Sequence, residues 1–367
     1  MDKLGKKQKG FIVVSKIVAV GTAVPPYVLS QSDAKTFAQQ LFPISYPQTE
    51  KLMNIFDNTA IDKRYISCEV DWFRNEHTFT QRNQIYVETA CKLAEDAVRS
   101  CLEQANINQK DIDHIFFVST TGLATPSIDA YLINQLGMRK HIKRTPIWGL
   151  GCAGGVAGLS RAYEYTKAFP DSRVLFVAVE LCSLTFRPQD LTKSNFVATS
   201  LFGDGAAAVL IAGDEVSLTG HAPSVIDSMS TIWPNSLDVM GWEVVEDGLK
   251  VIFSRDIPKI VQRQVKEVVD TFLDRCKLTI DQIDYMVSHP GGVKVLEAYE
   301  SALKVSKGKF SFAYDILQKF GNMSSVTVLF VLQQVLQTEP TRGYGLMTAL
   351  GPGFSSELLL LNWNKGG

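Results

Sequence analysis

The 367-residue sequence lacks the features that mark several common classes of protein. No apolar run reaches the roughly 20 residues that a membrane-spanning helix needs. The one stretch that resembles a signal peptide, residues 11–26, is broken by Lys16 and Gly21, so we expect a first core strand there instead. A net charge of −1 gives no reason to expect nucleic acid or an anionic membrane as a partner.

Motifs for cofactors and metals are equally scarce. No GxxxxGK[ST] phosphate loop occurs, and none of the glycine-rich turns is interpreted as a dinucleotide fingerprint. Cysteine never has CxxC spacing, which argues against a structural zinc site or a disulfide framework. Free thiols suggest a reducing compartment, so we expect a cytoplasmic protein without a metal. The six cysteines are Cys68, Cys91, Cys101, Cys152, Cys182 and Cys276.

Apolar runs that alternate with amphipathic stretches make up most of the chain. Such a pattern is typical of α/β proteins, in which helices cover both faces of a sheet. It predicts strands over 12–20, 112–120, 146–150, 173–180 and 206–212, and helices over 82–105, 126–136, 155–169 and 258–277.

Two segments of the chain repeat one scheme. INQKDIDHIFFVSTTG in the first half matches LTIDQIDYMVSHPGG in the second, and in each an apolar strand ends in a small-residue turn. Asp113 lies 39 positions before Cys152, and Asp284 lies 38 positions before Asn322. Unless the similarity is due to chance, Cys152 and Asn322 occupy equivalent strand-to-helix turns.

A duplicated α/β unit would divide the chain into two halves. We place them at residues 1–220, which carry the cysteine, and 221–367, which carry a histidine and the asparagine. His289 ends a strand of the second half, and chemistry in α/β sheets collects at such strand ends. We therefore expect Cys152, His289 and Asn322 to meet at one site.

The stretch WGLGCAGG gives Cys152 a setting that no other cysteine of the chain has. A turn at a helix N-terminus exposes unpaired N–H groups and the positive end of the helix dipole, which predicts a lowered pKa for the thiol. The glycines beside it are expected to let a thioester approach. The alternative is a small buried apolar cysteine, which is our interpretation of the other five.

Few side chains are available to activate this thiol. Of the five histidines, His289 alone ends a strand and is followed by PGG, whereas the others lie in an apolar strand or in polar loops. We predict that its imidazole holds the thiolate as an ion pair. Asn322 is predicted to donate hydrogen bonds to an oxyanion, with a simple helix cap as the alternative.

Five motifs together resemble the type III polyketide synthases, the chalcone-synthase-like enzymes. They are GCAGG, FGDGAAA, SHPGG, GNMSS and the closing GPG, in the order of that family and spread over residues 150–355. The resemblance is strongest to bacterial, alkylpyrone-forming members. It implies the thiolase fold, an α/β fold with duplicated βαβαβαββ halves in a five-layered αβαβα core. It also implies a homodimer, no cofactor, and acyl-CoA and malonyl-CoA as substrates.

The resemblance further implies roles for single residues. Cys152 would carry the acyl chain as a thioester, and His289 and Asn322 would stabilise the enolate from malonyl-CoA and the tetrahedral intermediates. Phe202 would be a gatekeeping ring between the CoA tunnel and the elongation cavity. Other cavity positions implied are Thr185, which tunes product size, Ser324 behind the asparagine, and the loop of Gly351, Pro352 and Gly353.

At three places the chain departs from the pattern of the family. The second gatekeeping phenylalanine falls within GLKVIF, where the alignment does not decide between Val251 and Phe253. Asparagines stand where plant members hold CoA phosphates with basic residues, which leaves Lys51 as the candidate and a solvated surface lysine as its simpler interpretation. Residues 124–127, ATPS, replace a methionine-containing segment that crosses the dimer interface in plant enzymes.

We therefore expect an acyltransferase that condenses malonyl-CoA iteratively, with decarboxylation, onto an acyl-CoA starter, for which a fatty acyl-CoA is expected. Two or three rounds would end in closure to an alkylpyrone or an alkylresorcinol-type ring. A ketoacyl synthase III-like enzyme that performs a single round is the alternative, although SHPGG argues against it. A thiolase-fold binding protein without turnover and a cysteine hydrolase are the other classes considered.

Overall fold

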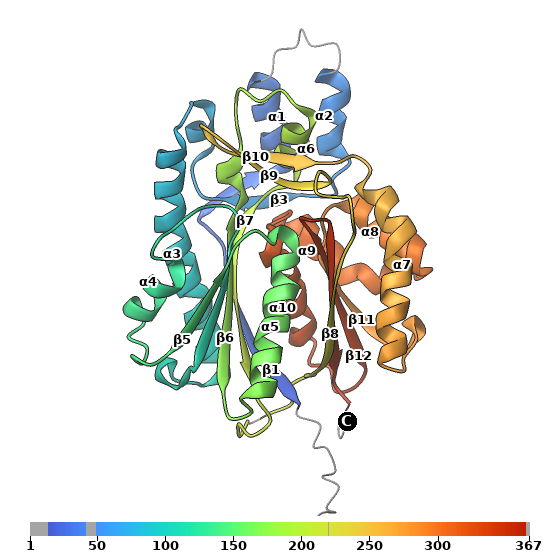
Figure 1. Ribbon diagram of the computed structural model, residues 1–367. Helices are drawn as coiled ribbons and strands as arrows, with labels where there is room; N and C mark the ends of the chain where they lie inside the picture. Colours follow the sequence, from blue (N-terminus) through green and yellow to red (C-terminus); the bar gives the residue numbers. More distant parts are fainter. Residues whose placement is uncertain (1–13, 42–48, 219, 365–367) are drawn as a thin grey trace, which may run out of the picture.

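Two groups of strands face each other across central helices in the computed structural model, which describes residues 14–41, 49–218 and 220–364 (Figure 1). The first group consists of β1 (Ser15–Ala23), β4 (His114–Val118), β5 (Lys143–Ile147), β6 (Arg173–Leu181) and β7 (Asp204–Ala212). The second consists of β8 (Ser224–Ile232), β11 (Ile283–Ser288), β12 (Tyr344–Gly351) and β13 (Ser355–Asn362). Hydrogen bonds join them into one sheet in the order β11-β12-β13-β8-β1-β7-β6-β4-β5.

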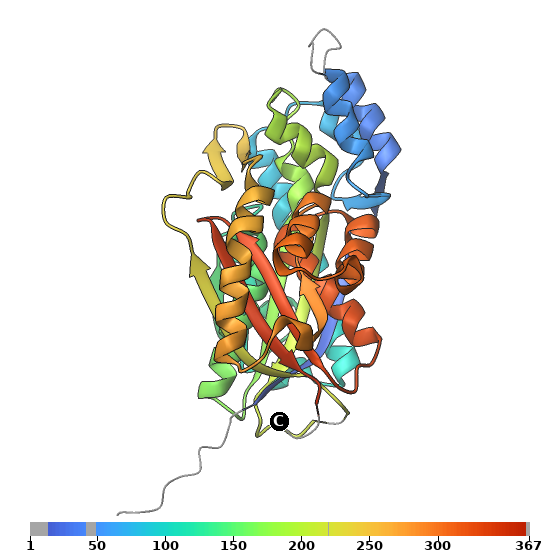
Figure 2. The same cartoon turned by 90° about the vertical axis from the view of Figure 1, so that its right-hand side faces the viewer.

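Helices form three layers around these strands. In the centre lie α5 (Gly154–Ala168) and α10 (Thr327–Gln337), with strands on both sides. The outer side of the first group is covered by α3 (Phe79–Ala105) and α4 (Ile128–Gln135). The outer side of the second is covered by α7 (Ile257–Arg275) and α8 (Val293–Leu303), and Figure 2 shows α7 in front of its strands. The order helix, strand, helix, strand, helix confirms the predicted five-layered α/β core.

The two groups of strands share one topology. β1 pairs antiparallel with β7, β7 antiparallel with β6, and β6 parallel with β4. β8, β13, β12 and β11 repeat these three relations in the same order. Asp113 accepts a hydrogen bond from Arg173 N (2.7 Å) and Asp284 accepts one from Tyr344 N (3.0 Å), so each carboxylate caps the first residue of a neighbouring parallel strand. The predicted repeat is therefore confirmed, and chance similarity is excluded.

The two groups meet edge to edge along a short ladder. Ser15 pairs with Val225, and Lys16 pairs with Ser224, which joins β1 to β8. The predicted division between residues 220 and 221 falls in the connection from β7 to β8, and it stays a prediction.

Local sequence explains why the core elements form. β4 and β7 are buried along their whole lengths, as strands covered on both faces require. α3 begins at a capping box, in which Thr78 Oγ1 accepts a hydrogen bond from Gln81 N while the Gln81 side chain accepts one from Thr78 N. A Cβ at Gly158 would lie 2.2 Å from the ring of Phe176, so this glycine lets α5 approach β6 closely. Within the described residues, no helix has the length and apolar character to cross a membrane.

Short elements form a cap over one end of the layers, at the top of Figure 1. Most of them were not predicted, because short amphipathic segments carry too little periodicity to be distinguished from loops. The strand predicted over 146–150 lies at Lys143–Ile147 instead, since the residues that follow form the turn before α5. The cap contains α1 (Gln31–Leu41), α2 (Thr49–Asp57), α6 (Lys193–Leu201), β2 (Tyr27–Ser30), β3 (Lys63–Ile66), β9 (Met240–Val245) and β10 (Gly248–Phe253), and α9 (Ser311–Phe320) contacts β3.

Candidate active site

A tight turn carries Cys152 between β5 and α5. Residues Gly151–Ala153 form a 3₁₀ turn that leads directly into the helix. Thr120 Oγ1 accepts a hydrogen bond from Gly151 N (3.1 Å), which ties this turn to the segment that follows β4. The thiol thus lies at the N-terminus of a central helix, as predicted.

The glycines of this turn pack closely against residues of the second half. A Cβ at Gly155 would lie 2.2 Å from Ser325 O, and one at Gly154 would lie 3.2 Å from Ser325 Cβ. Gly151, with a φ of +47°, would meet the Pro352 ring at 2.7 Å. The expectation that these glycines make room for a thioester stays a prediction, and Gly151 lines a cavity together with Cys152. The glycines let the two halves of the chain approach each other closely.

Asn322 occupies the equivalent turn of the second half, between α9 and α10. Its N–H donates to Leu201 O (2.8 Å), and Gly203 N donates to Asn322 O (3.0 Å). Ser324 N donates to Asn322 Oδ1 (2.8 Å), which fixes the orientation of the amide. Asn322 Nδ2 donates to Gly291 O (3.3 Å), and its second N–H is left for a ligand.

His289 directly follows β11. Its backbone N–H donates to Thr348 O (2.8 Å), which continues the pairing with β12 beyond the strand. The residue is 5% exposed, and neither ring nitrogen has a hydrogen-bond partner among the described residues. Because buried polar atoms are almost always paired, these two nitrogens indicate a place where a ligand binds.

One cavity brings the three predicted residues together. Cys152, His289 and Asn322 all line it, around about 340 Å³ of empty space. We call it the reaction cavity. The meeting of these side chains is as expected, while their catalytic roles stay predictions. The rest of its wall is almost entirely apolar and consists of Met240, Phe253, Ile257, Gly291, Val295, Tyr299 and Leu350.

Burial leaves both the cysteine and the histidine uncharged. It raises the pKa of the Cys152 thiol to about 12; Ser324 opposes this rise and the nearby Glu180 adds to it. Burial also lowers the pKa of His289 to about 3. The raised pKa contradicts the predicted lowering for the thiol, because loss of hydration disfavours the charged forms of both side chains, while the ion pair stays a prediction.

Glu180, at the end of β6, is a site residue that sequence reasoning missed. It is completely buried. Its Oε2 accepts hydrogen bonds from Thr120 N and Thr121 Oγ1 (both 2.9 Å), and its Oε1 accepts one from Ser325 Oγ (2.7 Å). It thus links the segment that holds the cysteine turn to the asparagine turn. An acid directly after the apolar run RVLFVAV was the signal that could have revealed it.

Comparison with known proteins identifies the family. The family model for the N-terminal domain of chalcone and stilbene synthases matches residues 5–215, and the model for their C-terminal domain matches residues 224–363. This chain belongs to the chalcone and stilbene synthases. It is thus a type III polyketide synthase, an acyltransferase that condenses malonyl-CoA with decarboxylation.

Similar proteins match the synthase over nearly its whole length. A putative chalcone synthase of Bacillus subtilis (strain 168) is 47% identical over 361 residues, which cover 95% of the synthase and 99% of that protein. A 1,3,6,8-tetrahydroxynaphthalene synthase of Streptomyces peucetius is 35% identical over 352 residues, with 95% and 93% covered. The crystal structure of the 1,3,6,8-tetrahydroxynaphthalene synthase of Streptomyces coelicolor aligns with a TM-score of 0.90 at 26% identity, covering 96% of the synthase and 100% of that chain.

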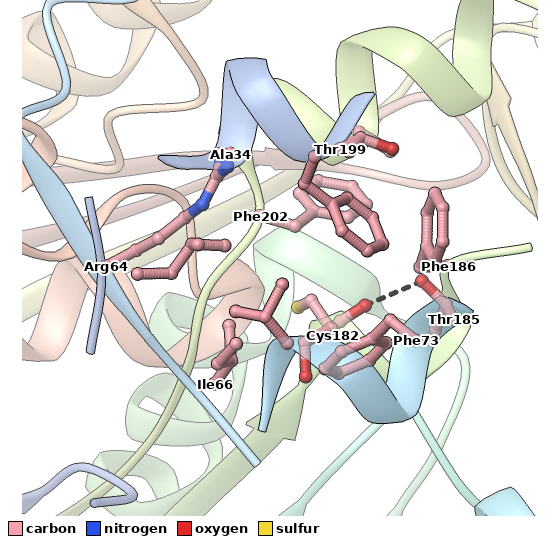
Figure 3. A pocket seen from close by; sticks show the side chains of 14 residues that line it. Ala34, Arg64, Ile66, Phe73, Cys182, Thr185, Phe186, Thr199 and Phe202 are labelled. Atoms are coloured by element: carbon pink, nitrogen blue, oxygen red, sulfur yellow. Dashed lines mark hydrogen bonds between the residues drawn. The ribbon is translucent and has the colours of Figure 1, made fainter. Parts of the chain in front are cut away.

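Two further cavities of the synthase meet at Phe202. The middle cavity, with about 390 Å³ of empty space, is lined by Cys152, Phe202, Ser324 and Pro352 among others. The distal cavity, with about 500 Å³, shares Phe202 and Cys182 with the middle cavity, and Figure 3 shows the side chains that line it, many of them from the cap. Phe202 and Cys182 therefore form the boundary between the cavity at the cysteine and the distal cavity.

Of the other predicted cavity residues of the synthase, some line a cavity and some pack against neighbouring residues. Thr185 lines the distal cavity, but its hydroxyl donates to Cys182 O (2.7 Å), as the dashed line in Figure 3 shows. Pro352 faces the middle cavity. A Cβ at Gly351 would meet Ala153 and Leu150, and one at Gly353 would meet Ile232, so these glycines serve close packing.

The hairpin β9–β10 adds an aromatic ring that sequence reasoning missed. Val251 and Phe253 both line the middle cavity, so the structure does not single out either as the second gatekeeper. Val251 pairs across the hairpin with Trp242. The Trp242 ring lies 6.1 Å from that of Phe202 in an edge-to-face arrangement. The pairing of two strands, which a linear motif does not contain, brings this ring to the cavity.

Proposed function

We propose that this synthase loads a fatty acyl-CoA starter onto Cys152 and extends it with malonyl-CoA over two or three rounds. The product then closes to an alkylpyrone or an alkylresorcinol-type ring. The distal cavity carries this proposal, because its mostly apolar wall continues from the cavities around the cysteine. An alkyl chain gains about 0.8 kcal/mol for each methylene that it buries against such a wall.

The loading step starts from a neutral pair. As the Cys152 sulfur attacks the thioester carbonyl, the imidazole of His289 accepts the thiol proton. The imidazolium and the free N–H of Asn322 then donate to the oxyanion. In an apolar, water-poor cavity such donors are strong, and one of them is typically worth about 3–4 kcal/mol. The tetrahedral intermediate then collapses, coenzyme A leaves as its thiol with the proton returned by His289, and the acyl group stays on the sulfur.

The extension step reuses the same groups. Malonyl-CoA loses CO₂, and the enolate oxygen that results is stabilised by His289 and Asn322. The enolate carbon attacks the acyl carbonyl, so that a carbon–carbon bond forms and the Cys152–acyl bond breaks. The lengthened chain then returns to the sulfur for another round.

This reaction, as proposed, uses CoA thioesters and no resident cofactor or metal. In the parts of the chain that the structure describes, no three or more His, Cys, Asp or Glu side chains form a group that could hold a metal ion. Lys51, the candidate for CoA binding, has its side chain outside the described residues.

We also propose a cytoplasmic location, which the six free cysteines support.

We further propose that the synthase is a homodimer. Leu123 is 43% exposed and Trp148 is 50% exposed. They lie near each other, because Trp148 Nε1 donates to Gly122 O (3.3 Å). Residues 124–127, which follow Leu123 directly, correspond to an interface segment of the plant enzymes. Exposed apolar surface of this kind is typical of a protein–protein interface.

Acyl-CoAs of graded chain length, each incubated with malonyl-CoA and analysed by product mass, test the proposed function. We expect products that carry two or three added units. A single added unit would indicate the one-round alternative, and no product from any acyl-CoA would overturn the proposal. Cys152→Ala should abolish acyl loading in intact-protein mass spectra. Cys276→Ala, a free cysteine after α7, is the matched control and should load normally.

A further inference from the structure

One charged side chain stands in the distal cavity, whose other lining residues are apolar apart from Ser183, Thr185 and Thr199. Arg64 of β3 lines the cavity although it is only 1% exposed. Neither Nη1 nor Nη2 has a hydrogen-bond partner among the described residues. In Figure 3 its guanidinium reaches the end of the cavity near Ala34, away from Thr185 and Phe186. The neighbouring apolar wall includes Leu29, Phe37, Ile66, Val70 and Phe73.

The protein compensates this charge only at a distance. Burial lowers the pKa of Arg64 to about 9, and the field of Asp204 opposes that shift, so the side chain is cationic at neutral pH. The Asp204 carboxylate is already engaged, because it accepts hydrogen bonds from Ser67 Oγ, Ser183 N and Ser183 Oγ. No ion pair of Arg64 is found within the described residues. A buried cation without a contacting anion is costly.

α1, which lines the distal cavity through Ala34 and Phe37, also carries a polar group without a partner. The Oε1 atom of Gln31, at the start of α1, is buried and unpaired within the described chain. Its amide nitrogen is fully used by Phe56 O, Thr59 Oγ1 and Ser200 O. A bond to this oxygen would engage one of the five N–H groups of the guanidinium and would not neutralise its charge.

We propose that Arg64 binds the far end of the starter chain and that this end is a carboxylate. This inference rests on the proposed function, since it assumes an acyl chain on Cys152. From the sulfur the chain would pass Phe202 and Cys182, which line both the middle and the distal cavity. Its methylenes would contact the apolar wall. A carboxylate would then pair with both unpartnered nitrogens of Arg64 in the two-pronged geometry that guanidinium favours.

The test compares two CoA thioesters of equal chain length, one ending in a methyl group and one in a carboxylate. With malonyl-CoA present, we expect the wild type to use the carboxylate-ended starter with a kcat/KM about tenfold higher or more, mainly through KM. Arg64→Met should reduce or reverse this ratio. Arg99→Met, which removes an exposed arginine from α3, should leave the ratio unchanged.

Ala34→Asp provides a second variant in case Arg64→Met does not fold. It adds a carboxylate near the intact guanidinium, and it should also lower the ratio. An unchanged ratio in folded variants, or a wild type that prefers the methyl-ended chain, overturns the assignment of Arg64 while leaving the proposed function in place. Failure of the wild type to condense either thioester with malonyl-CoA would instead refute the acyl-CoA starter itself.

Discussion

Glu180 makes the stability of the synthase depend on pH in a predictable direction. Burial raises its pKa from 4.5 to about 7, although hydrogen bonds from Ser325, Thr120 and Thr121 oppose the rise. Between these two values the folded protein therefore binds more protons than the unfolded chain. Stability must then fall as the pH rises from about 4.5 to about 7. A shift of this size corresponds to about 3 kcal/mol.

The substitution Glu180→Gln isolates this effect. Glutamine keeps the shape of the side chain but cannot ionise, and the Ser325 hydroxyl can turn to accept from the new amide. Urea unfolding of both proteins at pH 5 and pH 8 gives four free energies. We expect the variant to gain roughly 2–3 kcal/mol relative to the wild type at the higher pH. Asp204, whose pKa burial raises to about 6, titrates in both proteins and cancels from the comparison.

Two outcomes would refute this reasoning. If the difference in unfolding free energy between variant and wild type is the same at both pH values, Glu180 does not titrate in this range. If the variant instead loses stability relative to the wild type as the pH rises, the folded protein prefers the ionised carboxylate, and the network around Ser325 outweighs burial. Glu103→Gln, on the exposed side of α3, is the control and should show no such change.

The remaining predictions concern the contact between the halves and the assembly. Gly155→Ala should lower the Tm strongly and abolish activity, because its Cβ would lie 2.2 Å from Ser325 O. Gly308→Ala, whose Cβ would meet only Ser306 Oγ at 3.7 Å, should change the Tm little. Light scattering should give twice the chain mass of 40.6 kDa, and Trp148→Lys should shift it toward 40.6 kDa. A wild-type mass of one chain would contradict the proposed dimer.

Those parts of the site that depend on local pattern could be predicted from the sequence. Asp113 and Asp284 recur because each caps a strand start, and this repeat led to the paired turns of Cys152 and Asn322. The resting charge of the cysteine could not be predicted in this way. A motif contains the helix N-terminus that lowers a pKa, but not the apolar walls that raise it.

Other parts of the site depend on contacts between distant segments. The glycines of the cysteine turn are conspicuous in the sequence, yet their contacts with Ser325 and Pro352 come from the second half. Trp242 reaches the cavity through a hairpin whose pairing the sequence pattern does not define. Arg64 lies in a basic-polar stretch typical of a surface, and only the packing of β3 within the cap buries it.

Reactivity and choice of starter therefore depend on different contacts. Cys152 is held by the meeting of the two halves, through Gly155, Ser325 and Glu180, so a change there should impair every substrate alike. The distal cavity is walled largely by the cap, so a change there should alter which chain is accepted. The cysteine site and the distal cavity are linked at Phe202, because the backbone on either side of this residue is hydrogen-bonded to Asn322. A starter that displaces this ring would also move the oxyanion donor, so a poorly fitting chain should lower kcat as well as raise KM.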